Sequence, residues 1–191
     1  KYSGEHNKGL SLLLQAIAYF ENSGDEYHLA AFSHNIAGLY NMMNQPLNAM
    51  KHASTAITIG KAADHQEAYS GGLSALAEAQ FSLGFIEKAY ENLLLSDVVA
   101  HKNDHQEQIS NNMGILALIY SAQNKQGAAF KTHQDYIKRS RKLANNELNS
   151  QLTNIESEKL KQQVKQLKQK WFSGGNANNR WSFTDISKDE T

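Results

Sequence analysis

A 40-residue period is the feature that most constrains how this 191-residue chain can fold. When the chain is shifted by 40 residues, small, apolar and turn-forming residue types superpose at seven positions in three copies. A period of this length is typical of an array in which each unit packs on the next. The aligned positions begin with Ile36-Ala37-x-x-Tyr40, Leu76-Ala77-x-x-Gln80 and Leu116-Ala117-x-x-Tyr120, and continue with Asn44, Gly84 and Asn124 and with Ala49, Ala89 and Ala129.

Each repeated position has a physical role in a pair of antiparallel helices. Small residues such as Ala37 and Ala49 let the two helices approach closely. Asn and Gly, as at Asn44, tolerate the left-handed conformation in which a helix ends, and the single proline, Pro46, can begin the following helix. We therefore predict an all-α chain without strands, with helices near 6–22, 26–43, 46–62, 66–83, 86–102, 106–123 and 126–142.

Acidic tetrapeptides mark the predicted helix starts. Asp64-His65-Gln66-Glu67 and Asp104-His105-Gln106-Glu107 lie one period apart, and Ser23-Gly24-Asp25-Glu26 holds nearly the same place. We interpret each as a capping box, in which Ser or Asp accepts from the backbone and Glu three residues later returns a hydrogen bond. On this interpretation the two histidines have no role in the caps.

The repeated spacing resembles the tetratricopeptide repeat in its longer, 40-residue form. The resemblance covers residues 1–143 as a half repeat and three full repeats, and departs from the family pattern at Gln80, His133 and Tyr136. It implies a right-handed solenoid of antiparallel helical hairpins. The first helices of the hairpins would line a concave groove that binds peptides or segments of partner proteins.

The resemblance also implies which residues would contact a partner in the groove. Family members that grip a terminal carboxylate carry Lys and Arg on this wall, at positions held here by His34, Gly38, Ala75, Asn111 and Ile115. We therefore expect no carboxylate clamp, and a neutral groove that hydrogen-bonds the main chain of a bound segment. The expected partner-binding residues are His34, Asn35, Asn41, Met42, Ser74, Glu78, Phe81, Asn111 and Leu118, with Ala31, Gly38, Gly71, Gly114 and Ser121 beside them.

The repeat pattern ends after Leu143, and residues 144–172 are predicted to form a long helix rich in Gln, Lys and Glu. Four apolar residues near its end follow heptad spacing. A homodimerising or signal-transmitting connector and a helix that caps the solenoid are both open alternatives. These four residues are Leu160, Val164, Leu167 and Trp171.

Residues 173–191 begin with a Gly- and Asn-rich stretch, which predicts a flexible tail. Trp181 and Phe183 follow, so the segment is either a plain tail or a docking motif. The passage from Ala129-x3-His133-x2-Tyr136 into a charged helix resembles the junction of bacterial sensor proteins, in which tetratricopeptide arrays connect to an output domain.

Composition narrows the classes of function. Nineteen basic and nineteen acidic residues cancel, so nucleic acid is not an expected partner, and the longest apolar stretch, Met113 to Tyr120, is too short to span a membrane. There is no cysteine, and a turn over residues 102–105 interrupts the spaced pair His101 and His105, so we expect no metal site. No Gly-rich phosphate loop follows a strand and no Ser-His-Asp set is apparent, so we expect no cofactor and no enzymatic activity. The compartment, cytoplasmic or periplasmic, stays open for a chain expected to be soluble.

The leading hypothesis is a protein- or peptide-binding module, the sensory or scaffolding part of a bacterial regulatory protein. One alternative is a receptor for a short signalling peptide that acts on an output domain through the C-terminal helix. Another is a scaffold or assembly chaperone unrelated to signalling. In each case the groove would select its partner by shape and hydrogen bonding rather than by charge.

Overall fold

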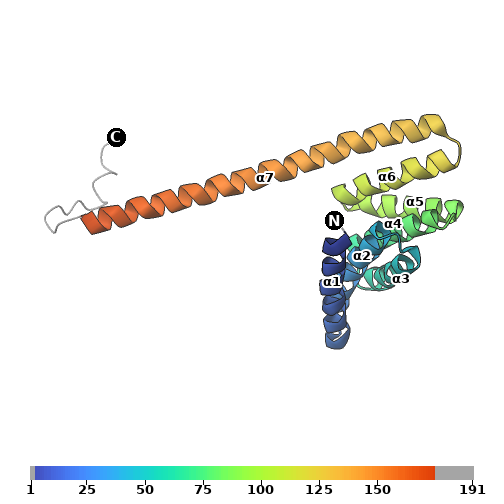
Figure 1. Cartoon of the computed structure of the whole chain (residues 1–191), viewed down its shortest axis with the longest axis horizontal. Helices are drawn as coiled ribbons and strands as arrows, with labels where there is room; N and C mark the ends of the chain where they lie inside the picture. Colours follow the sequence, from blue (N-terminus) through green and yellow to red (C-terminus); the bar gives the residue numbers. More distant parts are fainter. Residues whose placement is uncertain (1–2, 175–191) are drawn as a thin grey trace. The chain divides into compact units, whose positions relative to one another are not determined.

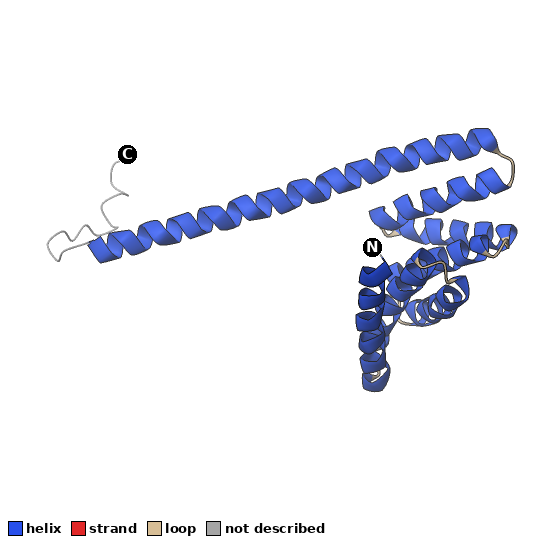
Figure 2. Cartoon of the chain, in the orientation of Figure 1, coloured by secondary structure: helices blue, strands red, loops and turns tan. Residues whose placement is uncertain are grey.

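The computed structural model describes residues 3–174, and every regular element in that range is an α-helix (Figures 1 and 2). The predicted all-α array of antiparallel hairpins followed by a long helix is confirmed. The aromatic segment around Trp181 and Phe183 lies outside the described residues. The helices are α1 (Ser3–Ser23), α2 (Glu26–Met42), α3 (Pro46–Ala62), α4 (Gln66–Ser82), α5 (Ile86–Lys102), α6 (Gln106–Ala122) and α7 (Gln126–Gly174).

The turns repeat every 20 residues, which is half of the period seen in the sequence. Each turn contains one residue with positive φ: Gly24, Asn44, Asp64, Gly84, Asp104 and Asn124. In the turn after α2 the N–H of Asn44 donates to the carbonyl of Asn41 at 2.9 Å, and the N–H of Gln45 donates to that of Tyr40 at 2.8 Å. This pair of bonds is the Schellman motif, which satisfies the last carbonyls of a helix.

The prediction of capping boxes at Asp64 and Asp104 is wrong. Both residues have positive φ, +54° and +56°, and end the preceding helix, because a three-residue turn places the left-handed residue two positions before the next helix. The N-cap is the following residue, and at His65 the Nδ1 atom accepts from the N–H of Ala68 at 3.4 Å. Glu67 and Glu107 are therefore not engaged in capping boxes.

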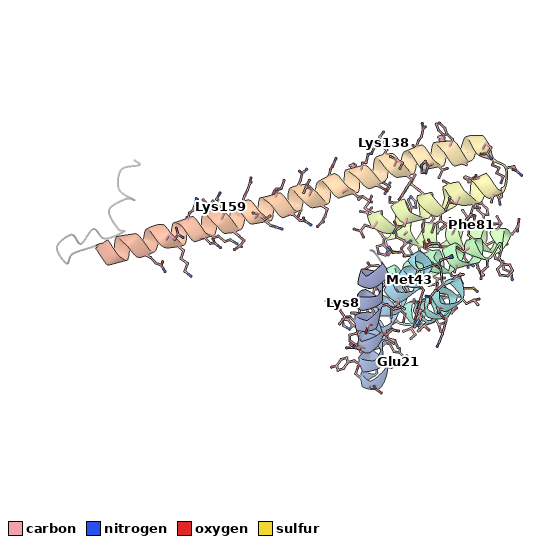
Figure 3. The ribbon with its side chains drawn as sticks, in the orientation of Figure 1. Lys8, Glu21, Met43, Phe81, Lys138 and Lys159 are labelled. Carbon is pink, nitrogen blue, oxygen red and sulfur yellow. The ribbon has the colours of Figure 1, made fainter. Side chains whose placement is uncertain are left out.

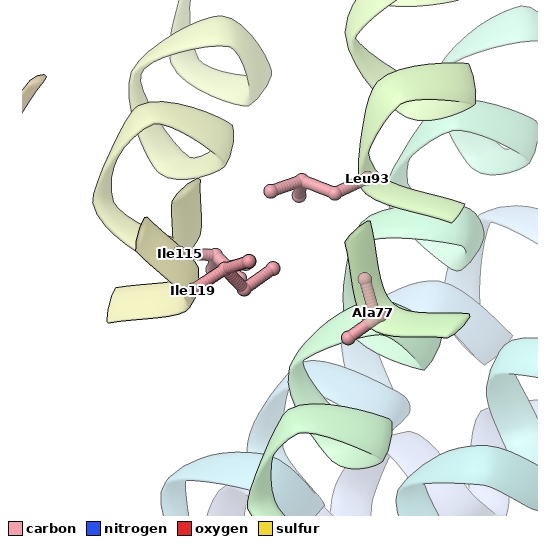
Figure 4. Close-up of a cluster of buried hydrophobic side chains, with 5 residues drawn as sticks. Ala77, Leu93, Ile115 and Ile119 are labelled. Carbon is pink, nitrogen blue, oxygen red and sulfur yellow. The ribbon is translucent and has the colours of Figure 1, made fainter. Parts of the chain in front are cut away.

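Alanine dominates the contact between the helices of each hairpin. Ala37 and Ala53 form one buried cluster with Ala75. A larger cluster joins α4, α5 and α6 through Ala77, Ala89, Leu93, Ile115 and Ile119, four of which are labelled in Figure 4. Small side chains at these positions keep the helices close, and the few large apolar residues fill the remaining space.

Two glycines permit a close approach between α3 and α4. A methyl group at Gly60 would lie 2.9 Å from the backbone nitrogen of Tyr69, and one at Gly72 would lie 3.0 Å from the Cβ atom of Ala56. Neither position has space for a side chain. Gly72 is therefore a position of close helix packing inside α4.

A buried polar network joins the second and third repeats. The hydroxyl of Ser96 on α5 donates to the carbonyl of Ser70 on α4 at 2.8 Å and accepts from the Nδ2 atom of Asn112 on α6 at 3.0 Å. Gln108 donates to the Oδ1 atom of Asn112 at 2.9 Å. Since Asn112 is 2 % exposed, these bonds replace those that its amide would make to water.

The last helix continues without a break from Gln126 to Gly174, whereas the sequence predicted separate helices over 126–142 and 144–172. Contacts divide the described residues into two units, with the boundary inside α7 between Leu143 and Ala144. In the first unit the hydroxyl of Ser140 on α7 lies 2.8 Å from that of Ser110 on α6. None of the helices in the described range is long and apolar enough to cross a membrane.

In the second unit, Leu160 and Val164 are 61 % and 42 % exposed. The side chains of Leu167 and Trp171, the other two residues of the predicted seam, lie outside those described. The apolar residues of α7 that are exposed in this unit are Leu148, Leu152, Ile155, Leu160 and Val164.

Candidate partner-binding groove

A cavity of about 1090 Å³ lies along the first unit, and its wall comes chiefly from α2, α4 and α6. These helices pack side by side, α2 against α4 and α4 against α6, while α3 and α5 contribute no lining residue. We call this cavity the groove. Its lining residues are Leu13, His34, Asn35, Gly38, Leu39, Met42, Glu67, Gly71, Ser74, Ala75, Glu78, His105, Gln106, Glu107, Gln108, Asn111, Gly114, Ile115, Leu118, His133 and Tyr136.

Most of the residues expected to contact a partner do line the groove. The expected residues that line it are polar, apolar and acidic on α2 and α4, and are an amide, a glycine and an apolar residue on α6. Met42 and Leu118 are 66 % and 54 % exposed, so apolar surface is available to a bound segment. The expected residues on the wall are His34, Asn35, Met42, Ser74, Glu78, Asn111 and Leu118, together with Gly38, Gly71 and Gly114.

Asn41 and Phe81, one period apart, are not among the residues that line the groove. The Nδ2 atom of Asn41 donates to the carbonyl of Ala75 at 2.9 Å and to the Oε2 atom of Glu78 at 3.1 Å. Phe81, labelled in Figure 3, is partly buried against the core cluster that joins α4, α5 and α6. One residue along a helix turns a side chain by about 100°, which explains why Asn41 differs from Met42. Ala31 and Ser121 are also absent from the wall.

Several groove residues were missed because the sequence suggested other roles for them. Glu67, His105 and Glu107 line the groove. The sequence suggested capping boxes for the two glutamates and no role for His105. His133 and Tyr136 stood out only as departures from the repeat pattern. For Tyr136 the sequence contained one indication of this position, the small residue Gly114 on the facing helix, where a methyl group would lie 3.4 Å from the ring of Tyr136.

His34 on α2 lies against the backbone of α4. A methyl group at Gly71 would come within 2.8 Å of its Cδ2 atom, so the glycine makes room for the imidazole ring. Its Nδ1 atom is buried and has no hydrogen-bond partner among the described residues. Burial lowers the pKa of His34 below the usual 6.5, so the ring is neutral at physiological pH.

The groove wall is acidic, which corrects the expectation of a neutral surface. It carries the carboxylates of Glu67, Glu78 and Glu107, and no Lys or Arg occurs among the described residues that line it. None of these three carboxylates takes part in an ion pair within the described part of the chain. Burial raises the pKa of Glu78 above its usual 4.5, while the hydrogen bond from Asn41 acts in the opposite direction.

The histidines of the wall do not assemble a metal centre in the described range. Over residues whose positions are described, no group of three or more His, Cys, Asp or Glu is arranged to hold a metal ion. The polar chemistry of the groove therefore consists of carboxylates, amides and imidazoles that face a cavity open to a ligand.

The fold and the groove define a class: a tetratricopeptide-type solenoid, as the sequence resemblance implied. No family model matches the chain, and no curated protein matches its sequence. Among solved structures, the tetratricopeptide domain of Arabidopsis FLU is similar with a TM-score of 0.54 and 13 % identity, over 61 % of this chain and 98 % of that one. Tetratricopeptide-like repeats of a putative kinesin light chain from Podospora anserina reach 0.52 and 19 %, over 75 % and 70 %. At these identities the likeness concerns the fold.

Proposed function

We propose that this chain is a protein-interaction module that holds a segment of a partner protein in the groove. The observation that carries the proposal is one continuous cavity lined by the first helices of consecutive repeats, α2, α4 and α6. The tetratricopeptide fold, which is an interaction module rather than a typical enzyme scaffold, supports it. The residues that line the groove would contact the partner, and Asn35, Met42, Asn111 and Leu118 would make the main contacts.

The wall has the chemistry that an extended or helical segment requires. The side chains of Asn35 and Asn111 are exposed on it, and their amides can pair with the main chain of a ligand. Met42 and Leu118 offer apolar surface that a partner would remove from water. The volume, about 1090 Å³, is at the upper limit for small-molecule pockets, which favours a peptide segment over a metabolite.

The finer proposal is that the array is the sensory or scaffolding part of a bacterial regulatory protein, with α7 as its connector. The exposed apolar residues of α7 beyond Leu143, among them Leu160 and Val164, support a contact between two copies of the helix. The mass of wild type and of a Leu160→Glu, Val164→Glu variant in light scattering tests this. A dimeric wild type and a monomeric variant would support a connector role for α7. If wild type and variant are both monomeric, α7 is instead a solvent-exposed cap.

Two functional alternatives differ in the consequence of binding. In a receptor for a short signalling peptide, ligand in the groove changes the state of α7 and an attached output. In a scaffold or assembly chaperone, binding has no such effect. Hydrogen exchange along Ala144–Gly174, with and without bound partner, separates them, because only the receptor transmits a change to that part of α7.

Capture of partners by matched variants tests the groove itself. An Asn111→Ala, Leu118→Ala double variant changes the wall, and a Leu94→Ala, Val98→Ala variant on α5 removes exposed apolar side chains that do not line it. We expect the first variant to lose bound protein and the second to retain it. Equal recovery from both would place the interaction on another face and contradict the proposal.

A further inference from the structure

Glu78 is a carboxylate in an unusual position for a charged group. It lies partly buried in the middle helix of the groove wall, and its one hydrogen bond in the described structure comes from Asn41 at 3.1 Å. Asn41 has two amide protons, and the other is used by the carbonyl of Ala75. Asn41 therefore cannot further compensate the charge of Glu78, and no Lys or Arg side chain is paired with it in the described residues.

The surroundings of Glu78 in the groove are negative or neutral. Glu67 and Glu107 add two more carboxylates to the wall. The remaining titratable groups on the wall are His34, His105, His133 and Tyr136. A basic segment along the groove would thus meet carboxylates and no fixed Lys or Arg among the described residues of the wall, with Glu78 in the last turn of α4 and Glu67 and Glu107 in the first turns of α4 and α6.

The wall around these carboxylates also suits the rest of a basic side chain. Gly38 occupies the position one period before Glu78, and a methyl group there would meet nothing within 4 Å. This leaves open space on the neighbouring helix. Met42 and Leu118, exposed on the same wall, offer apolar surface to the aliphatic part of a long side chain.

We propose that the groove binds a basic segment of its partner protein, with one Arg or Lys side chain paired with the carboxylate of Glu78. The proposal rests on the proposed function of the groove and adds the chemistry of the partner. Arg fits best, since its planar guanidinium matches the geometry of a carboxylate. The interaction is stronger than a surface ion pair because the carboxylate is partly desolvated before the ligand arrives.

A positional-scanning library of short peptides tests this with the intact chain. Each pool has Arg, Gln or Glu fixed at one position and mixed residues elsewhere, and binding is measured by fluorescence polarisation. For wild type we expect one position at which the Arg pool binds about tenfold more tightly than the Gln pool, with the Glu pool weakest. Higher salt should reduce the advantage of Arg.

Matched variants identify the carboxylate responsible. In Glu78→Gln the advantage of Arg over Gln at that position should vanish. Glu91→Gln on α5, an exposed carboxylate outside the wall, should keep the tenfold preference. A preference for Arg that survives Glu78→Gln unchanged would overturn the assignment to Glu78.

Failure of this inference is distinguishable from failure of the proposed function. Equal binding of Arg, Gln and Glu pools, all weakened by the Asn111→Ala, Leu118→Ala double variant, would overturn the basic partner and leave the groove as the binding surface. Binding of all pools that this double variant does not affect would overturn both. Tighter binding of the Glu pool would replace the basic partner by an acidic one.

Discussion

The Nδ2 atom of Asn41 on α2 donates to the Oε2 atom of Glu78 on α4 at 3.1 Å. The bond crosses from one repeat to the next and places a carboxylate with limited exposure on the wall of the groove. Burial disfavours the ionised form of Glu78, and the amide of Asn41 compensates part of that cost. The repeat pattern requires neither residue type, because in the third repeat Ser121 holds the position of Asn41 and Leu118 holds that of Glu78.

Replacement of Glu78 by Gln should stabilise the free protein at neutral pH. The raised pKa of Glu78 means that the folded state favours its protonated form, so its contribution to stability is lost as pH rises through the folded pKa. Gln is neutral at every pH and keeps an oxygen that accepts from Asn41. We expect the melting temperature at pH 7 to rise by about 1–3 °C, with a smaller difference near pH 4. A lower melting temperature at pH 7 would show that the charge of Glu78 stabilises the fold.

Acidification should destabilise the array through three histidines, of which His65 is buried and His34 and His52 are partly buried. Burial lowers the pKa of His34, His52 and His65 below the usual 6.5. Below pH 6.5 the unfolded chain therefore binds more protons than the folded chain. The free energy of unfolding is highest above pH 6.5 and decreases as the pH falls toward the histidine pKa values of the folded state. Urea unfolding at pH 7.5, 6.5 and 5.5 measures this, and the midpoint should decrease in that order.

His65 should account for part of this pH dependence because it is also a cap. Its Nδ1 atom accepts from the N–H of Ala68, and its ring stacks on Tyr27 with centroids 4.0 Å apart. Protonation would remove the acceptor and place a positive charge at the N-terminus of α4. His65→Asn keeps a neutral cap and should flatten the decrease between pH 6.5 and 5.5. His101→Asn, on an exposed side chain, is the control, and an equal flattening in both variants would contradict the assignment.

Two glycine substitutions should have opposite effects on stability. Gly84 has φ of +82° in the turn after α4, where an L-residue is strained, so Gly84→Ala should cost about 1–2 kcal/mol. Gly38 lies inside α2, and a methyl group there would meet nothing within 4 Å. Gly38→Ala should therefore stabilise by about 0.5–1 kcal/mol. Denaturant unfolding of both variants checks the signs, and a stabilised Gly84→Ala variant would contradict the conformation of the turn.

Adjacent asparagines on α6 should separate stability from binding. Asn112 is buried and bonded to Ser96, so Asn112→Ala leaves polar groups without partners and should cost about 1–3 kcal/mol. Asn111 is exposed on the groove wall, and Asn111→Ala should change stability by less than about 0.5 kcal/mol. Unfolding free energies of the pair test the difference. Similar losses in both would show that the network is not a major source of stability.

The balanced charge of the chain suggested a partner selected without electrostatics, and the groove changes that view. Net charge sums over all residues, whereas a ligand experiences the groups that face it. Glu67 and Glu107 could not be placed on the wall from sequence, because the preceding Asp residues resembled caps. Only the positive φ of Asp64 and Asp104 shows that the turn ends one residue later than a capping box requires.

The sequence by itself determined helices α2 to α6 to within a residue and the turns between them, because these depend on local hydrogen bonding and on residues such as Asn44 and Gly84 that tolerate positive φ, whereas it divided α7 into two helices. It also indicated which helices line the groove, through the resemblance to the tetratricopeptide repeat. Tertiary structure decided which side chains face it. Asn41 and Phe81 turn toward a neighbouring helix, whereas Tyr136 reaches the wall opposite Gly114. Such choices depend on contacts between residues that are distant in the chain, which a periodic pattern does not encode.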